Sequence, residues 1–183
     1  MKRNSMLLLV SLILILVGSL PDVLVAQPAV SFGQQVAVLK SLKSDLQVLG
    51  VMSSTLNEKE IANITRTATQ QGLKLFVAQI TKPQDIAQFY KKLVSEKKAQ
   101  IILIPSADDD MMLRFGFDFL KENTVVDKIG LCVPDVSYLS QGAFCFITKE
   151  EGKIKAYVNQ RISAFVGAAI PKEENPSIDY VVK

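Results

Sequence analysis

Hydroxyl and carboxyl side chains follow three apolar segments of the sequence, and they are the groups best able to bind a small polar ligand. The candidates are Ser53 and Ser54, Ser106 and Asp108, and Asp135 and Ser137. Hydroxyls, carboxylates and the amides of helix N-termini can together hold a small polar molecule. The same residue types also cap helices and close turns, so each residue taken singly is explained at least as well by a structural role.

The apolar segments predict the strands that position these residues. Ile101 to Ile104 form an unbroken apolar run that Pro105 ends, which is typical of a central parallel strand buried on both faces. Segments 45–52, 73–80 and 129–133 are predicted as further strands, with amphipathic helices between them.

This alternation predicts an α/β fold, a single three-layer, doubly wound and mostly parallel sheet in the order 2-1-3-4-5. A fifth strand over 142–148, a turn over 150–153 and a return strand over 154–158 add a C-terminal hairpin. The three polar loops then meet at the carboxyl edge of the sheet, where open α/β sheets bind ligands. Asn159 is expected to begin the last helix and Gly167 to end it.

The acidic run Asp108-Asp109-Asp110 could suggest a metal site, but three consecutive carboxylates at a helix start do not converge on one point. We expect no metal, and we interpret Asp109 and Asp110 as a charged helix start. The chain contains no His, and no nucleophile–base pair is recognisable, so we expect no catalytic residues, no cofactor and no enzyme activity. The net charge of +3 is small and the lysines are spread over helices, which argues against nucleic-acid binding.

The N-terminus has the features of an export signal. Basic residues precede an apolar run over 6–20, and Ala26 suits a signal peptidase, so we predict a signal peptide over 1–26 and a periplasmic protein. A membrane anchor is the alternative, although the run is short for a span of roughly 20 residues. Residues 29–170 form the predicted domain and 171–183 a flexible tail. Cys132 and Cys145 could pair in an exported protein or remain buried thiols.

Several blocks resemble one lobe of the periplasmic substrate-binding proteins of ABC transporters, in the group related to tryptophan and tyrosine uptake. They include "VAVLKSLKSDLQVLGVMSST", "QQGLKLFVAQITKPQDI", "KKAQIILIPSADDDM" and "IGLCVPDVSYLSQGA". The resemblance implies that all six candidate residues face a ligand cleft. It also implies a small polar solute and a membrane transporter as partners. The family's cleft lies between two lobes and this sequence resembles one, so a homodimer that rebuilds the cleft is left open.

The C-terminal block "GAFCFITKEEGKIKAYVNQRISAFVGAAIP" resembles a second family, small periplasmic proteins that repress a membrane-bound diguanylate cyclase. Two hypotheses follow. The first is an exported single-lobe protein that binds a small polar ligand or a partner through its strand-end loops. The alternative is a periplasmic regulator that acts on a membrane sensor without any small ligand.

Overall fold

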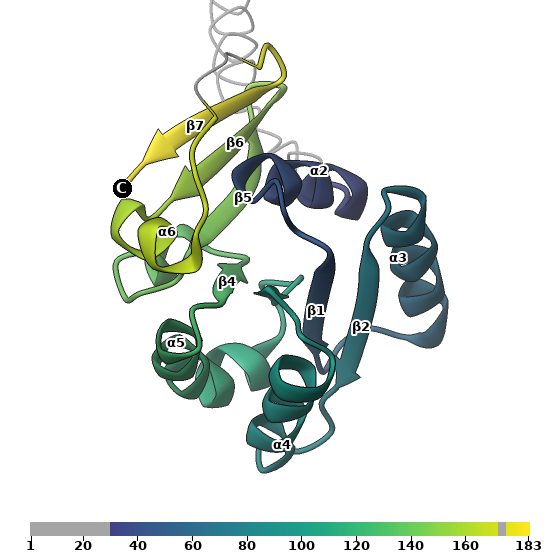
Figure 1. Cartoon of the computed structure of the whole chain (residues 1–183). Helices are drawn as coiled ribbons and strands as arrows, with labels where there is room; N and C mark the ends of the chain where they lie inside the picture. Colours follow the sequence, from purple (N-terminus) through teal and green to yellow (C-terminus); the bar gives the residue numbers. More distant parts are fainter. Residues whose placement is uncertain (1–29, 172–174) are drawn as a thin grey trace, which may run out of the picture.

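One seven-stranded sheet, in the order β2-β1-β3-β4-β5-β6-β7, organises the chain (Figure 1). The computed structural model describes residues 30–171 and 175–183. Strands β1 to β5 are parallel neighbours, β6 is antiparallel to β5, and β7 is parallel to β6. The strands are β1 (Val48–Ser53), β2 (Lys74–Gln79), β3 (Ile101–Leu103), β4 (Gly130–Val133), β5 (Cys145–Glu150), β6 (Lys153–Val158) and β7 (Ile178–Val182). The predicted α/β class and the order 2-1-3-4-5 are confirmed, with two strands added beyond β5.

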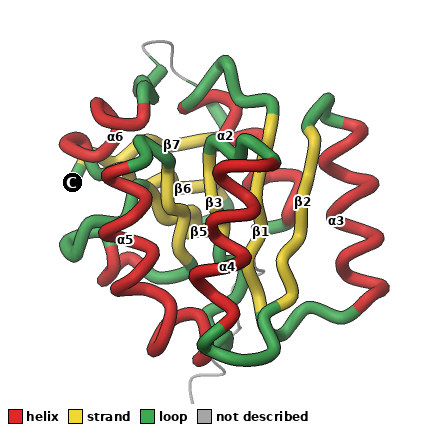
Figure 2. The backbone as a smooth tube through the Cα atoms, turned by 60° about the horizontal axis from the view of Figure 1, so that its bottom comes forward, coloured by secondary structure: helices red, strands yellow, loops and turns green. Residues whose placement is uncertain are grey.

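Helices cover both faces of the sheet. Helices α2 (Phe32–Leu42), α3 (Glu58–Gln70) and α6 (Gln160–Val166) supply buried residues to the apolar cluster on one face. Helix α4 (Asp85–Lys91), its π-helical extension η1 (Lys92–Glu96), the π-helix η2 (Met111–Gly116) and α5 (Phe117–Val126) supply the cluster on the other face. Figure 2 shows α4 crossing in front of the strands. The predicted three layers are therefore present.

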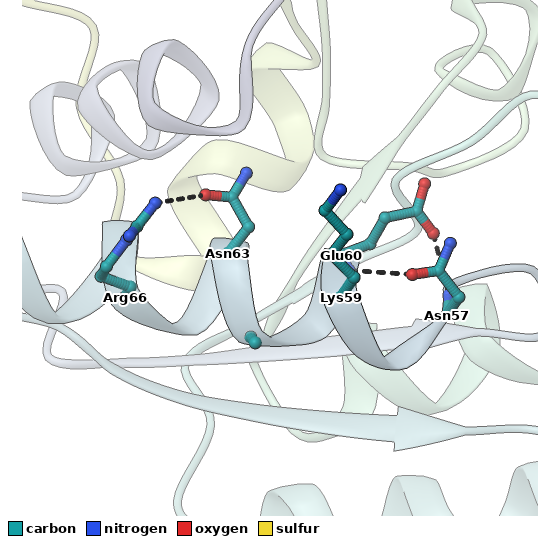
Figure 3. A pocket seen from close by; sticks show the side chains of 6 residues that line it. Asn57, Lys59, Glu60, Asn63 and Arg66 are labelled. Carbon is teal, nitrogen blue, oxygen red and sulfur yellow. Dashed lines mark hydrogen bonds between the residues drawn. The ribbon is translucent and has the colours of Figure 1, made fainter.

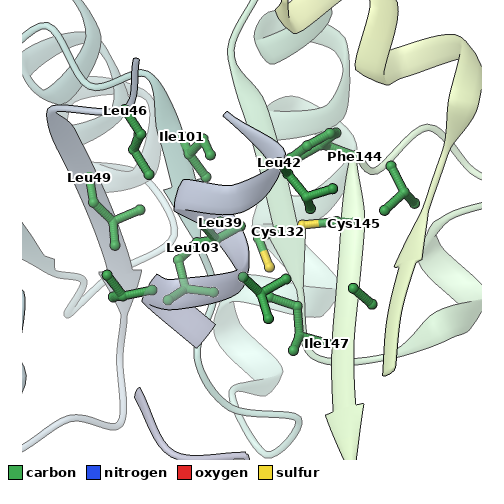
Figure 4. Close-up of a cluster of buried hydrophobic side chains, with 14 of the residues drawn as sticks. Leu39, Leu42, Leu46, Leu49, Ile101, Leu103, Cys132, Phe144, Cys145 and Ile147 are labelled. Carbon is green, nitrogen blue, oxygen red and sulfur yellow. The ribbon is translucent and has the colours of Figure 1, made fainter. Parts of the chain in front are cut away.

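The position of β3 between two helix-covered faces of the sheet explains why its sequence is apolar without interruption. Ile101 and Leu103 belong to the cluster under α2, whereas Ile102 and Ile104 belong to the cluster under α4 and α5. Successive side chains of a strand point to opposite faces, so a strand covered on both sides needs apolar residues at every position. Figure 4 shows the first cluster, in which Leu39 and Leu42 of α2 lie over the strands.

Local signals in the sequence account for several element ends. Asn57 and Glu60 form the predicted capping box of α3, and the Asn159 side chain accepts the Ile162 amide at the start of α6. Glu151 and Gly152, with φ of 50° and 82°, make the two-residue turn between β5 and β6. Gly167 ends α6 with a φ of 66°, as predicted.

The C-terminal segment corrects one prediction. Residues 171–183 were expected to form a flexible tail, but Ile178–Val182 form β7, which pairs with β6 over its whole length. Ile178 is buried in the cluster under α2, and the Tyr180 hydroxyl is hydrogen-bonded to the Ser41 hydroxyl. Two prolines and several charges suggested a frayed end, whereas apolar packing against α2 stabilises a strand.

Two remaining predictions concern the chain's location and its thiols. The predicted signal peptide over 1–26 lies outside the described residues. Within 30–171 and 175–183, no helix is long and apolar enough to cross a membrane. Cys132 and Cys145 are buried free thiols at directly opposite positions of β4 and β5. Burial and a hydrogen bond with Cys132 raise the pKa of the Cys145 thiol.

Candidate functional site

The loops that follow β1, β3 and β4 meet at the carboxyl edge of the sheet, because these strands are parallel neighbours in the order β1-β3-β4. The sequence predicted this convergence. The structure divides the polar groups at this edge into a buried cluster around Asp109, an exposed turn at Asp135, and a hollow beside Ser106.

Asp109 is the centre of the buried cluster and is 0% exposed. One carboxylate oxygen, Oδ2, accepts hydrogen bonds from the Ser53 hydroxyl at 2.8 Å and the Ser54 amide at 2.7 Å. The other, Oδ1, accepts from the Ser54 hydroxyl at 2.6 Å and the Met112 amide at 3.2 Å. We call Asp109, Ser53, Ser54 and Met112 the Asp109 cluster. It ties the loop after β1 to the first turn of η2.

The Asp109 cluster defines what Ser53 and Ser54 do in this structure. Ser53 is 0% exposed, and both serine hydroxyls donate to Asp109. A buried carboxylate needs such donors because desolvation strongly disfavours its charged form. The two serines predicted to face a ligand therefore satisfy the hydrogen-bonding capacity of a buried carboxyl group. The interpretation of Asp109 as merely a charged helix start is wrong.

Asp135 and Ser137 form the exposed turn that begins the short 3-10 helix Val136–Tyr138. The Asp135 Oδ1 atom accepts from the Ser137 amide at 2.8 Å and from the Ser137 hydroxyl at 2.6 Å. These hydrogen bonds to the ionised form lower the pKa of the Asp135 carboxyl below its ordinary value. Both side chains remain open to solvent, so the turn leaves them accessible.

A hollow of about 330 Å³ opens at the ends of β3, β4 and β5. We call it the carboxyl-edge hollow. Its lining comes from the start of α2 and from three strand ends: Val30, Gln35, Pro105, Ser106, Ala107, Pro134, Phe146, Ile147, Thr148 and Lys149. Ser106 is the one predicted site residue among them. Asp108 is exposed just beyond it, and its amide donates to the Ser106 hydroxyl at 3.1 Å.

The chemistry of the carboxyl-edge hollow is that of a small amphipathic site. Pro105, Pro134 and Phe146 supply apolar surface, and Ser106 and Thr148 supply hydroxyls. Among the described residues that line it, Lys149 alone carries a charge. The Gln35 Oε1 atom is buried and has no hydrogen-bond partner within the described chain, while its Nε2 atom donates to the Val30 carbonyl at 3.5 Å. An unpaired buried acceptor is costly, so Gln35 is the lining residue whose hydrogen-bonding capacity the described chain leaves incomplete.

A second and larger depression, of about 680 Å³, is a weaker candidate. Its lining is Asn57, Lys59, Glu60, Ala62, Asn63 and Arg66, all from α3 or its cap. Figure 3 shows these side chains side by side along one helix, with Asn57 and Glu60 joined by the capping box. Arg66 donates to Asn63 at 3.1 Å. These groups satisfy one another on a solvated helix face, and no second element converges on them.

Sequence reasoning missed Asp109, Gln35 and the β5 segment 146–149. A signal for Asp109 exists, because it lies three residues before the Met112 amide that it caps, in the loop after β3, and β3 is the neighbour of the strand that ends at Ser53. To choose Asp109 among the three aspartates, one must know at which residue the following helix begins and which of its sides faces the sheet. Gln35 carries no comparable signal, because its role depends on where α2 crosses the sheet. In the described part of the chain, no group of three or more metal-ligating side chains comes together.

Comparisons with known proteins bear on the fold. No protein-family model matches the sequence, and no curated protein matches it either. Solved structures do match. An ABC domain from Streptococcus pneumoniae in complex with L-tryptophan superposes with a TM-score of 0.65 at 15% identity, over 82% of this chain and 61% of that one.

Two further structures give the same result. A ligand-free, open substrate-binding protein with adhesive properties from Clostridium difficile has a TM-score of 0.62 at 18% identity, over 84% of this chain and 60% of that one. A conserved domain protein from Vibrio cholerae has a TM-score of 0.63 at 17% identity, over 83% of this chain and 60% of that one. This chain spans about three-fifths of the matched chains. The resemblance to ABC-type substrate-binding proteins is therefore confirmed at the level of fold, and the chain has the architecture of a substrate-binding-protein lobe.

Proposed function

We propose that this chain binds a small polar ligand in the carboxyl-edge hollow, as a single substrate-binding-protein-like lobe. The observation that carries the proposal is that Gln35, whose buried Oε1 atom has no hydrogen-bond partner within the described chain, lines the hollow together with Ser106, Thr148 and Lys149. A ligand with a hydrogen-bond donor at one end and a negative group at the other would complement Gln35 and Lys149. Amino acids and small carboxylates that carry an amine or hydroxyl have this chemistry.

The six predicted residues contribute in different ways under this proposal. Ser106 contacts the ligand in the hollow, whereas Asp108, Asp135 and Ser137 are exposed next to lining residues of the loops after β3 and β4 and are available to a larger ligand. Ser53 and Ser54 act indirectly, because their bonds to Asp109 hold the loop that follows Ala107. The signal peptide would export the protein, and N-terminal sequencing of the accumulated form would test the cleavage predicted after Ala26.

A thermal-shift screen against amino acids and small carboxylates tests the proposal directly. We expect at least one stabilising ligand, and we expect Lys149→Ala to raise its Kd by roughly tenfold, since a charge-assisted hydrogen bond is lost. Lys153→Ala is the matched control, because Lys153 lies on the same hairpin, is exposed and does not line the hollow. Gln35→Leu should weaken the same ligand while leaving the free protein at least as stable, because it removes an unsatisfied acceptor.

The regulator alternative predicts a different outcome. A protein that acts on a membrane sensor without a small ligand would give no stabilising hit and would co-purify with a membrane protein. Equal effects of Lys149→Ala and Lys153→Ala on a hit would place the ligand elsewhere and contradict the proposed site.

A further inference from the structure

Strand β7 ends the sheet on the side opposite to β2, and its outer edge is the feature from which this inference starts. Val182 is 47% exposed, and the Asp179 side chain is 43% exposed. Edge strands present unpaired backbone groups that can join another strand, and proteins commonly protect them. Figure 1 shows β7 as the outermost strand, ending at the C-terminus.

Backbone hydrogen bonds identify which residues of β7 face outward. Ser177 accepts the Ile154 amide at 3.2 Å, and the Lys183 amide donates to Val158 at 2.9 Å, so odd-numbered residues are directed at β6. The even-numbered residues between them are therefore directed at the free edge. The Ile178 amide donates a hydrogen bond to the Asn175 carbonyl oxygen at 3.1 Å. The N–H and C=O groups of Tyr180 and Val182 have no backbone partner among the described residues, so they form the outer edge of β7.

These two residues are spaced for pairing with a second copy of the same strand. In an antiparallel pair centred on Val181, Tyr180 of one copy stands opposite Val182 of the other. Both are outward-directed residues, so each such pair can exchange two N–H···O=C bonds. A register shifted by one residue would oppose outward-directed and inward-directed residues and would lose this match.

The charges of the strand fit the same register. Centring on Val181 places Asp179 of one copy opposite Lys183 of the other, twice by symmetry. Both side chains lie on the sheet face away from α2, since Lys183 sits over the Tyr157 ring at 5.6 Å and Asp179 lies 3.9 Å from Lys153. Of the described residues of β5, β6 and β7, Phe146 and Tyr157 pack, partly buried, against the cluster under α4 and α5, and none is buried in it. Opposite charges at directly opposed positions stabilise an antiparallel pair.

We propose that two copies of this chain associate reversibly by antiparallel pairing of β7 about Val181. The two-fold axis is perpendicular to the joined sheet. Because the axis reverses strand direction, the carboxyl-edge hollows of the two copies point in opposite directions. This dimer does not rebuild a two-lobed cleft, and it is independent of the proposed ligand site. The contact is short, so we expect weak association that is visible at high protein concentration.

Sedimentation equilibrium of the protein, in the form in which the cell accumulates it, tests the proposal. We expect a concentration-dependent dimer whose dissociation constant rises roughly tenfold in Lys183→Glu, because two ion pairs become like-charge pairs. Asp179→Lys should have a similar effect, and the double variant Asp179→Lys/Lys183→Glu should restore dimerisation. Lys59→Glu on α3 makes the same charge change away from β7 and should leave the dimer unaffected.

Amide hydrogen exchange supplies a second measurement that does not depend on the variants. Dimerisation should slow exchange at Tyr180 and Val182 as concentration rises, while Asp179 and Val181 are already protected by β6. Thermal melts of each variant confirm that it folds. The proposal is overturned if the protein is monomeric at all concentrations. It is also overturned if the dissociation constant is unchanged in both single charge reversals and the Tyr180 and Val182 amides stay unprotected.

Discussion

Asp109 and Asp135 show how the same chemistry acquires different roles at one edge of a sheet. Each carboxylate follows a parallel strand, and each accepts a hydroxyl and an amide from serine. Asp109 is wholly buried, and three of its four hydrogen bonds come from Ser53 and Ser54, more than fifty residues earlier. Asp135 takes its donors from a residue two positions later and stays exposed. The first joins two segments of the fold, whereas the second shapes a turn that would form locally.

The substitution with the largest expected effect on stability is Asp109→Ala. It leaves two hydroxyls and two amides without their acceptor in a buried position, so we expect a loss of about 3 kcal/mol in the free energy of unfolding. For a chain of this size the melting temperature should fall by about 6 to 12 °C. Urea denaturation measures the change. Asp110→Ala is the matched control, because Asp110 is exposed and pairs only with Arg114 on the surface, so it should stay within about 0.5 kcal/mol of the parent. Equal losses in the two variants would contradict a central role for Asp109.

The second test compares the serines that serve the two carboxylates. We expect Ser53→Ala to destabilise the protein by about 1.5 kcal/mol, since it removes a buried hydroxyl that donates to the Asp109 side chain. Ser137→Ala removes a solvent-exposed hydrogen bond within one turn and should lower the free energy of unfolding by no more than about 0.5 kcal/mol. Chemical denaturation of both variants in the same buffer measures the two losses in the free energy of unfolding. If Ser137→Ala were the more damaging, the turn at Asp135 would be supporting more of the fold than its exposure implies.

The smallest effect is the contribution of Asp135 to the pH dependence of stability. Its pKa is lowered in the folded state, so its contribution to stability is present above the ordinary value of 3.8 and is lost as the pH falls through the folded value. Ser137→Ala should move the pKa of Asp135 back toward 3.8, because both donors that lower it belong to residue 137 and the hydroxyl contributes most. A carbon-detected NMR titration of the Asp135 carboxyl measures this directly. An unchanged pKa in that variant would show that another group stabilises the ionised form.

Much of the fold could be predicted because its signals are local. The run Ile101 to Ile104, the capping pair Asn57 and Glu60, and the left-handed Gly167 each follow from a few neighbouring residues. Strand β7 was missed because its stability comes from packing of Ile178 and Tyr180 against a helix about 140 residues away, which no window of the sequence contains.

The sequence by itself determined that a parallel sheet would gather serines and aspartates at its carboxyl edge, since strand order and polarity follow from the alternation of apolar segments. The tertiary structure decided which of those groups remain free. It buried Asp109 against Ser53 and Ser54 and left Asp135 in solvent. It also placed Gln35, whose Oε1 atom has no partner within the described chain, in the same lining as Ser106. Hydrogen bonds between distant segments depend on how elements pack, and packing is a property of the whole chain.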